Sequence, residues 1–456
     1  MTKRVGVAAR NGLTAAFFGL MLFTVVAHAQ EEVFQRGIEF GIGARALGMG
    51  GAYIGVSDDY SATYWNPAAL TQIRRIEGFG TMSYTQYKDN VASSTLALTD
   101  EEAYTRFNSF GLAYPIPTFR GSLVLSLGYN RVRPYDSNFG FSWFNATPGD
   151  SVGQRWSEVE EGGLNNWAFA VATEVAPNFS VGGALNIWSG KNEYQFSFIE
   201  RDEFNLYTFD DFRSDETIQS DFSGYNVKLA AMYHPASPLR VGLTLATPTT
   251  LTVEEQWRTY EETNDDDGGQ STFDEGGRFK YKISSPIAIG GGASINVAGL
   301  LLSGSAEYND WSNVRYKTEP PIDGLSESEA NDRIRRQYRE TLRLHLGAEF
   351  TLPLVNLQVR GGYVYDPTIL SKEAFQEFYN LEEIPKNANR QFLTAGLGIF
   401  LDKQVRLDLA VMAGEWHEYK APLADMGDGQ GNDIDVIPVS EKIRVNKALA
   451  TLAFRF

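Results

Sequence analysis

Cysteine is absent from this chain of 456 residues. Disulfide bonds and thiolate nucleophiles are therefore excluded, and stability has to come from another source, such as a large hydrogen-bonded framework. Histidine is scarce, with four residues in the whole chain. The sequence also has no serine in a recognisable nucleophile motif, no glycine-rich phosphate loop followed by a helical pattern and no Cys/His cluster. These absences predict a protein that is not an enzyme and that uses no metal or other cofactor.

Positive charge is also in short supply. The chain has 40 lysine and arginine residues against 57 aspartate and glutamate residues, which gives a formal net charge of −17. A protein that binds nucleic acid needs a basic face. Nucleic acid is therefore not expected among the partners of this chain.

Long apolar runs are missing except near the N-terminus. The stretch Leu13–Ala27 follows a basic start with Lys3 and Arg4, and it ends in the small-x-small sequence of residues 27–29. It is about 15 residues long, short of the roughly 20 residues that a spanning helix needs. These features are typical of a cleaved secretory signal peptide, which we place at residues 1–29. The rest of the chain is therefore expected to be exported.

The exported part of the chain shows strict alternation of apolar and polar residues. Leu342, Leu344 and Leu346 alternate with Arg343 and His345, and comparable runs lie at residues 123–130, 225–233, 300–309 and 405–411. Such alternation gives a strand with one apolar and one polar face. Strands of a soluble sandwich also alternate, but they are typically about 5–6 residues long. Runs of about 9 to 15 residues fit tilted strands that cross a membrane.

Turn signals divide these segments into fourteen strands. Six short turns are predicted, at residues 115–120, 176–178, 235–238, 296–299, 353–356 and 402–403, and they join twelve strands. Residues 78–87 and 443–456 add a first and a last strand. Seven long polar segments connect the strands at the other end, at residues 88–106, 132–165, 191–219, 248–278, 312–338, 366–389 and 418–440. Together with the C-terminal Phe456, this pattern predicts an all-β protein, a 14-stranded antiparallel transmembrane β-barrel over residues 76–456 in a bacterial outer membrane.

Residues 30–75 do not alternate and are rich in glycine. Glycine permits tight turns and close backbone approach. A barrel of fourteen strands is wide enough to leave a channel or to need a plug, because about eight strands already fill their own interior. Residues 30–75 are therefore predicted to form a hatch inside the lumen.

The same segment carries a family resemblance. Residues 43–53 read Gly-Ala-Arg-Ala-Leu-Gly-Met-Gly-Gly-Ala-Tyr, and they are followed by Ser57-Asp58-Asp59 and by Asn66, Pro67 and Ala68. This series resembles the N-terminal hatch of the FadL/TodX family, outer-membrane transporters of long-chain fatty acids and aromatic hydrocarbons. The Asn-Pro-Ala triplet is similar to the family's most recognisable motif. Residues 307–312 and 362–367 resemble later strands of the family, so the resemblance covers nearly the whole exported chain.

The resemblance implies passive uptake of hydrophobic small molecules, such as long-chain fatty acids, hydrocarbons or related lipids. The ligand would first bind in a groove between outer loops, then enter a pocket in the barrel. A hatch rearrangement and a kink in the third strand, for which Gly128 is the candidate, would open a lateral path. The candidate groove residues come from the third long segment and are Phe196, Phe198, Phe204, Tyr207, Phe209 and Phe212. As an alternative to a groove, this segment packs on itself or extends a strand above the membrane.

Several questions stay open at this point. Acidic segments at residues 265–267 and 425–435 would repel a free carboxylate at long range, which favours neutral hydrocarbons or lipids over fatty acids. Residues 425–435 also have calcium-loop-like spacing but no closing glutamate, so a solvated loop is expected there. A PorV-like component of a protein secretion system, which binds protein cargo, is the alternative function. Outer-membrane lipid, lipopolysaccharide and the barrel-assembly machinery are the other expected partners.

The lumen-facing charged residues are mixed in sign. The alternation places Lys228, Arg343, Glu349, Arg360, Arg406 and Asp408 on the inner face of their strands, together with His345. We expect these side chains either to line a watered interior or to anchor the hatch. For His345 a hydrogen-bonded place in this polar lining is preferred over a role in proton transfer.

Overall fold

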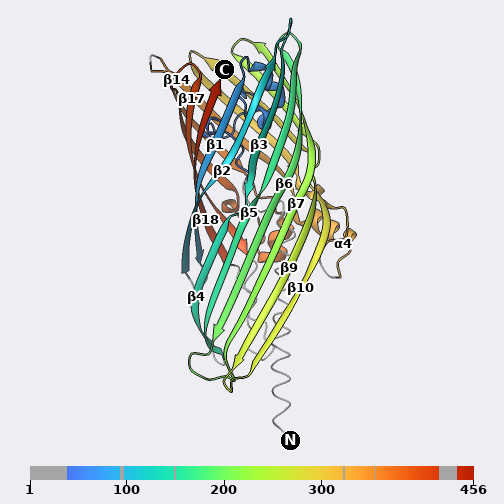
Figure 1. The fold of residues 1–456 in the computed structure, drawn as a ribbon, viewed down its shortest axis with the longest axis vertical. Helices are drawn as coiled ribbons and strands as arrows, with labels where there is room; N and C mark the ends of the chain where they lie inside the picture. Colours follow the sequence, from blue (N-terminus) through green and yellow to red (C-terminus); the bar gives the residue numbers. More distant parts are fainter. Residues whose placement is uncertain (1–38, 93–96, 148–149, 322–323, 354, 421–438) are drawn as a thin grey trace.

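The computed structural model describes residues 39–92, 97–147, 150–321, 324–353, 355–420 and 439–456. Its main feature is an antiparallel sheet that closes on itself, because β1 (Glu77–Ala92) pairs with the last strand, β18 (Val439–Arg455). Successive crossings of the wall lie side by side around the barrel (Figure 1). The others are β2 Ala97–Ile116, β3 Leu123–Pro134, β4 Ser137–Thr147, β5 Asp150–Ala176, β6 Phe179–Arg201, β7 Phe209–Ala236, β8 Leu239–Ala246, β9 Thr250–Asp265, β10 Gln270–Ser284, β11 Ala288–Val297, β12 Leu300–Asp310, β13 Arg315–Tyr316, β14 Glu340–Leu352, β15 Leu357–Asp366, β16 Arg390–Phe400 and β17 Val405–Lys420.

These strands make fourteen passes of the barrel wall. β4 continues the position of β3, since both pair with β5. In the same way β8 and β9 form one pass, since both pair with β7. β10 and β11 form the next pass, since β10 pairs with β9 and β11 pairs with β8. β13 has two residues and pairs only with β10. The predicted 14-stranded antiparallel barrel is therefore confirmed.

All six predicted short turns join strands at one end of the barrel, the end that also holds the C-terminus (Figure 1). They lie at residues 117–122, 177–178, 237–238, 298–299, 353–356 and 401–404. Asn178, Ala298 and Asn356 have φ angles of 64°, 52° and 50° in these turns. Tight hairpins need such positive φ values. Because outer-membrane barrels place their short turns in the periplasm, this end is the periplasmic one.

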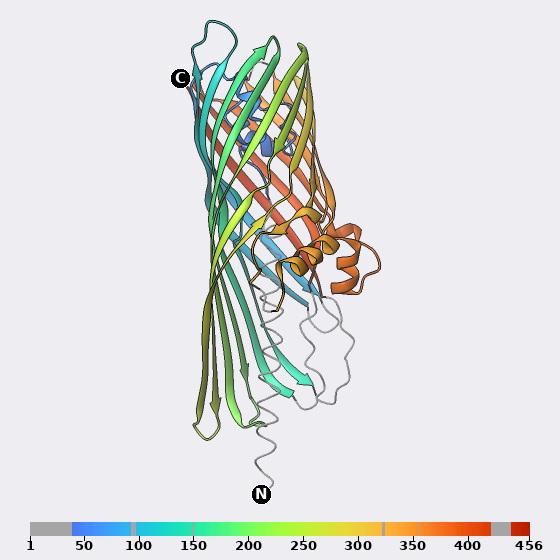
Figure 2. The same ribbon diagram turned by 90° about the vertical axis from the view of Figure 1, so that its right-hand side faces the viewer.

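The long polar segments at the other end are mostly strands and not loops. β5, β6 and β7 are 27, 23 and 28 residues long and continue far beyond the membrane crossing as an outer extension (Figure 2). Of the predicted loop at residues 191–219, only residues 202–208 lie outside strands. Two segments carry helices instead, α4 (Glu327–Gln337) and α5 (Lys372–Tyr379), with the short η2 (Trp311–Asn313) and η3 (Lys386–Ala388).

Along the long strand β6, the face that carries the apolar residues changes from the outer to the inner one, which explains this difference. In β6 the apolar Leu185 and Ile187 point outward and are exposed. Farther from the periplasm Tyr194 and Phe196 point inward and are buried, while Glu193 on the outward face is exposed. Lipid surrounds the first part of the strand and water surrounds the second, so the outward face changes from apolar to polar.

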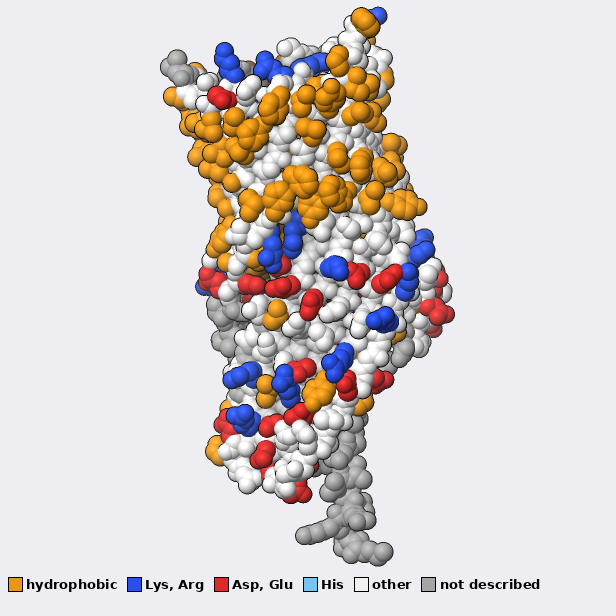
Figure 3. Space-filling model, viewed as in Figure 1, with side chains coloured by type: hydrophobic (Ala, Val, Ile, Leu, Met, Phe, Trp, Pro, Cys, Tyr) orange, Lys and Arg blue, Asp and Glu red, His pale blue; other side chains and the backbone are white. Residues whose placement is uncertain are grey.

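Apolar side chains cover the outer surface in one band near the periplasmic end (Figure 3). Outward residues such as Leu127, Leu243, Leu346 and Leu393 are exposed. Charged side chains are frequent on the outer part of the barrel, and several Lys and Arg side chains also lie at the periplasmic rim, but few lie within the band (Figure 3). A barrel with such a band is stable when the band lies in the hydrocarbon of a membrane.

The segment before β1 lies inside the barrel, near the periplasmic end (Figures 1 and 2). It forms α2 (Ala44–Gly48), α3 (Ala62–Trp65) and η1 (Pro67–Gln72). Its apolar side chains share one core with small wall residues such as Ala170 and Ala184. Among the helices of the described ranges, none is long and apolar enough to cross a membrane. The expected signal peptide, residues 1–29, lies outside the described residues.

Candidate functional site: the hatch and the lumen wall

The Asn66-Pro67-Ala68 motif starts η1 and ties it to the rest of the hatch. Asn66 is fully buried and caps the helix, since its Oδ1 accepts a hydrogen bond from the Ala68 amide at 3.1 Å. Its Nδ2 donates to the carbonyl of Ile54 at 2.9 Å and, more weakly, to that of Ala231 in β7 at 3.4 Å. Pro67 occupies the first helical position, where no amide hydrogen is needed. The motif therefore holds a turn, a second hatch segment and the wall together.

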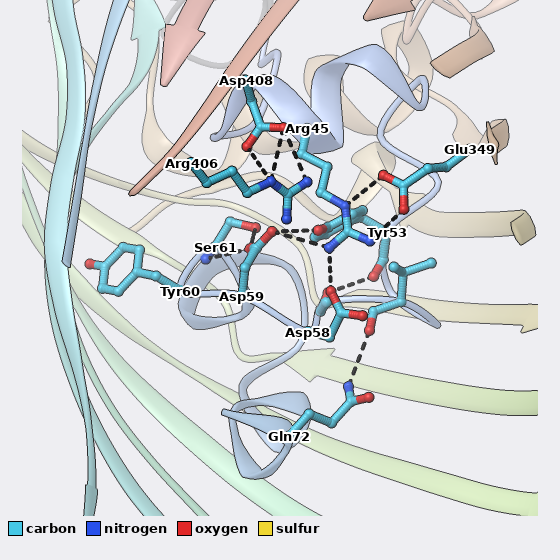
Figure 4. A network of polar contacts seen from close by, with 12 residues as sticks. Arg45, Tyr53, Asp58, Asp59, Tyr60, Ser61, Gln72, Glu349, Arg406 and Asp408 are labelled. Carbon is cyan, nitrogen blue, oxygen red and sulfur yellow. Dashed lines mark hydrogen bonds and ion pairs between the residues drawn. The ribbon is translucent and has the colours of Figure 1, made fainter. Parts of the chain in front are cut away.

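Arg45 of α2 lies at the centre of a buried ion-pair network (Figure 4). Its guanidinium donates to both carboxylate oxygens of Glu349 in β14, each at 2.8 Å, and it also pairs with Asp58 in the hatch. Asp58 in turn pairs with Arg240 of β8 at 3.2 Å. Buried charges are stable only when they are paired and hydrogen-bonded. These contacts therefore fix α2 and the Asp58 turn to two separate parts of the wall.

The network continues along the wall beyond Glu349. Arg360 of β15 donates to Glu349 at 2.6 Å and pairs with Asp408 of β17 at 2.7 Å. Arg406 pairs with the same Asp408 at 3.0 Å. Four of the six predicted lumenal charges therefore form one connected chain that ends on the hatch at Arg45, which agrees with the second of the two roles expected for them.

Two further lumen-facing residues bind the backbone of the hatch. Lys228 of β7 donates from Nζ to the carbonyl of Tyr64 at 2.7 Å. Nδ1 of His345 in β14 lies 2.7 Å from the carbonyl oxygen of Gly50. Arg343, in contrast, pairs with Asp366 within the wall at 2.9 Å. His345 is thus part of a hydrogen-bonded contact between hatch and wall.

Tyr60 of the hatch lies against the wall between β2 and β3. Its hydroxyl donates to the carbonyl of Leu127 at 2.8 Å. A Cβ atom on Gly128 would lie 1.3 Å from this hydroxyl oxygen, and one on Gly111 would lie 1.8 Å from it. Gly128 and Gly111 are therefore needed to make room for the Tyr60 ring.

The predicted kink of the third strand does not lie at Gly128. β3 pairs regularly with β2 and β5 at Gly128, and the register of the β3–β5 pair shifts between Arg131 and Arg133. Gly128 is held in the ladder on both sides. The irregularity falls instead just past Asn130, where the β2–β3 ladder ends and β3 continues to pair with β5.

The six candidate groove residues are divided between strands and a strand connection. Phe196 and Phe198 lie in β6 and Phe209 and Phe212 in β7, whereas Phe204 and Tyr207 lie in the connection between them. The ring of Phe196 is 4.6 Å from that of Trp156 in β5, and the rings of Phe198 and Phe212 are 6.5 Å apart. Tyr207 stacks on Phe209 at 5.7 Å, and Phe204 contacts Phe144 of β4 at 5.5 Å. The predicted alternative, a strand extension above the membrane, describes four of these six residues, whereas Phe204 and Tyr207 lie in the connection at its end.

The inner face of the extension also carries carboxylates. Glu216 of β7 is buried there, nine residues before Tyr225, the first outward apolar residue of this strand in the lipid band. Burial raises the pKa of Glu216 to about 7, and the nearby carboxylates of Glu255 and Glu158 add to this effect. The outer part of the lumen is therefore lined by aromatic rings and by a carboxyl group that titrates near neutral pH.

Several anchoring residues were not predicted. Arg45 and Tyr60 are the most important, together with the hydroxyl pairs Thr63–Ser126 at 2.5 Å and Thr71–Ser180 at 2.9 Å. The sequence offers one indication of the role of Arg45, since it is the one basic residue between positions 41 and 73. The sequence gives no indication of the hydroxyl pairs, because serine and threonine are frequent at such positions.

The described residues form no candidate metal site. Within the ranges that the structure describes, no group of three His, Asp or Glu side chains is placed to hold a metal ion. The acidic segment at residues 425–435, with its calcium-loop-like spacing, lies outside those ranges.

The sequence itself places the chain among known proteins. Residues 41–434 match the family model of the outer membrane protein transport proteins, OMPP1/FadL/TodX. The chain belongs to this family. The predicted family and the predicted location in the outer membrane are thereby confirmed. No curated protein sequence matches the chain.

Solved structures of the FadL/TodX family share the fold. The toluene transporter TodX of P. putida is 12% identical, with a TM-score of 0.60 over 92% of this chain and 99% of that one. A FadL homologue of Pseudomonas aeruginosa is 13% identical, with a TM-score of 0.58 over 92% and 99% of the two chains. The monoaromatic hydrocarbon channel CymD is 14% identical, with a TM-score of 0.52 over 92% and 98%. At these identities the likeness establishes the fold alone.

Proposed function

We propose that this FadL/TodX family member takes up hydrophobic small molecules passively through its plugged barrel. The observation that carries the proposal is the hatch. A barrel that serves free diffusion needs no plug, whereas here Arg45, Tyr60 and Asn66 tie an internal segment to several strands of the wall. A toluene transporter and a monoaromatic hydrocarbon channel share the fold, which supports an apolar cargo.

The outer extension supplies the first contact for such a cargo. Trp156, Phe196 and Phe198 put aromatic rings on its inner face. Burial of apolar area against such rings is favourable without any specific polar contact. Carboxylates such as Glu158 and Glu255 near the same face favour a neutral molecule over a free fatty acid. We therefore place capture at this face and not in a loop groove.

Passage to the periplasm requires the hatch to rearrange. The hatch is held by non-covalent polar contacts, such as those of Arg45 and Lys228, and not by covalent bonds. Closed strand pairing satisfies the backbone of the wall without the hatch, so the hatch is free to rearrange while the barrel stays folded. We expect no catalytic activity, and no feature of the described residues favours the secretion alternative.

Uptake by intact cells tests this function. Cells that produce the chain and cells that carry the empty vector are given radiolabelled toluene, and the initial rate of uptake is measured. We expect faster uptake in the producing cells, with unchanged entry of a small sugar. Equal toluene uptake in both strains, with the barrel present in the outer membrane, contradicts the proposal.

A further inference from the structure

Four asparagines form one row on the lumen wall, across β3, β5, β6 and β7. They are Asn130, Asn166, Asn186 and Asn226, and all four are buried. Asn130 is the register partner of Asn166, and Asn186 is that of Asn226. Nδ2 of Asn166 donates to Asn186 at 3.1 Å, Nδ2 of Asn186 to Asn226 at 2.9 Å, and Nδ2 of Asn226 to Thr249 at 2.8 Å. The amides are thus chained side by side around this part of the wall.

The chain of amides is incomplete at the β3 end. Asn130 has no exposed surface, and neither its Oδ1 nor its Nδ2 has a hydrogen-bond partner in the described part of the chain. Oδ1 of Asn166 is equally unpaired. Buried polar atoms are nearly always hydrogen-bonded, so these unpaired amide groups need a partner from outside the described residues. Because an amide has one donor and one acceptor end in either orientation, this end of the row offers both.

The unpaired amides at this end of the row are themselves uncharged. The next residue, Arg131, shares Asp136 with Arg106, at 2.9 and 2.8 Å, and its Nε has no hydrogen-bond partner among the described residues. Lys228, two residues from Asn226, is engaged with the Tyr64 carbonyl. A carboxylate ligand would bring only acceptors to a place that already has two unpaired acceptors. An uncharged group that both donates and accepts is the chemistry that fits.

The row lies between two apolar layers of the lumen. On the periplasmic side, Gly128 is two residues from Asn130 and contacts Tyr60 of the hatch. On the outer side, Leu164 is two residues from Asn166 and belongs to an apolar cluster with Phe222 and Leu251. A molecule that moves from the outer extension to the hatch therefore meets the row directly before the hatch.

We propose that Asn130 and Asn166 form a headgroup subsite for uncharged apolar molecules that carry a hydroxyl group, such as phenols or aliphatic alcohols. The hydroxyl donates to Oδ1 of Asn166 and accepts from Nδ2 of Asn130, while the apolar body lies against the outer cluster. A pure hydrocarbon leaves these amides unpaired and binds less tightly. This inference rests on the proposed uptake of hydrophobic molecules and names the class of cargo within it.

Calorimetric binding of p-cresol and p-xylene to the purified, detergent-solubilised protein tests the subsite. The two compounds have similar size and differ by a hydroxyl in place of a methyl group. We expect p-cresol to bind about tenfold more tightly, the effect of about two net hydrogen bonds. In Asn130→Leu, p-cresol affinity should fall to that of p-xylene, whose own affinity should stay within about twofold.

Two further variants separate a binding role from a structural one. Asn166→Leu removes the other half of the subsite and should give the same loss as Asn130→Leu. Asn186→Leu interrupts the row but leaves both free amides, so it should keep the preference for p-cresol. Equal binding of both compounds to the wild type, or equal loss in Asn186→Leu, overturns the subsite. If neither compound binds the wild type, the proposed function fails as well.

Discussion

Asn66 links three elements through one side-chain amide, and this makes it the most informative single residue of the hatch. In Asn66→Ala the N-cap of η1 and the hydrogen bond to Ile54 are lost. We expect the hatch to be destabilised by about 1–2 kcal/mol. The barrel should keep its resistance to unfolding in detergent, whereas single-channel leak should rise and uptake should change. Unchanged leak and unchanged uptake count against this role of Asn66.

A second prediction at the residue scale concerns Gly128. Gly128→Ala puts a methyl group on the Tyr60 hydroxyl, so the ring must leave its place between β2 and β3. We expect faster proteolysis of the hatch from the periplasmic side, with the barrel intact. Gly80→Ala is the matched control, because a Cβ there meets no atom within 4 Å. Equal proteolysis of the two variants contradicts the contact.

The sequence predicted some of these residues and not others, for a physical reason. Asn66, Pro67 and Ala68 belong to a motif, and the lumenal charges follow from strand phase, so both were accessible. Arg45 is visible as a lone basic residue, but its partner Glu349 is 304 positions away. Such pairing depends on the position of the hatch inside the barrel, and a local sequence pattern gives no information about that position. The same holds for the unpaired amide of Asn130.

At the scale of elements, the outer extension is the main departure from the sequence-based expectation. The alternation of apolar and polar residues continues in the extension, but there the apolar residues point into the barrel and the polar ones point to water. Residues 191–219 were therefore predicted to be a polar loop that contains aromatic residues. Proline, asparagine or glycine marks five of the six turns at the periplasmic end directly, and these turns were predicted correctly, as was the sixth at Asp402 and Lys403. Strand length above the membrane has no such signal, since water tolerates both loop and strand.

The extension should respond to pH through Glu216. Its pKa in the folded protein, about 7, lies above the ordinary value of 4.5. The stabilising contribution of its protonated form is therefore complete below pH 4.5 and is lost as the pH rises through 7. We expect β7 amides around Glu216 to exchange hydrogen more slowly at pH 5 than at pH 8, after correction for intrinsic rates. Glu216→Gln should remove most of this difference, and an identical pH response in that variant refutes the assignment.

At the scale of the whole molecule, the fold separates two tasks. The wall is stable through its own closed hydrogen bonding, and it spans the membrane with an apolar band. The hatch is held in the bore by contacts to opposite parts of that wall, from β3 and β7 on one side to β14 on the other. We therefore expect uptake through this protein to depend on movement of the hatch.

A reversible lock on the hatch tests this central claim most directly. The hydroxyl oxygens of Thr63 and Ser126 are 2.5 Å apart, so cysteines at both positions can form a disulfide between hatch and wall. The chain has no other cysteine to interfere. We predict that oxidised Thr63→Cys/Ser126→Cys protein loses toluene uptake and regains it after reduction, while each single variant behaves as the wild type. Undiminished uptake by the fully oxidised double variant would contradict the account.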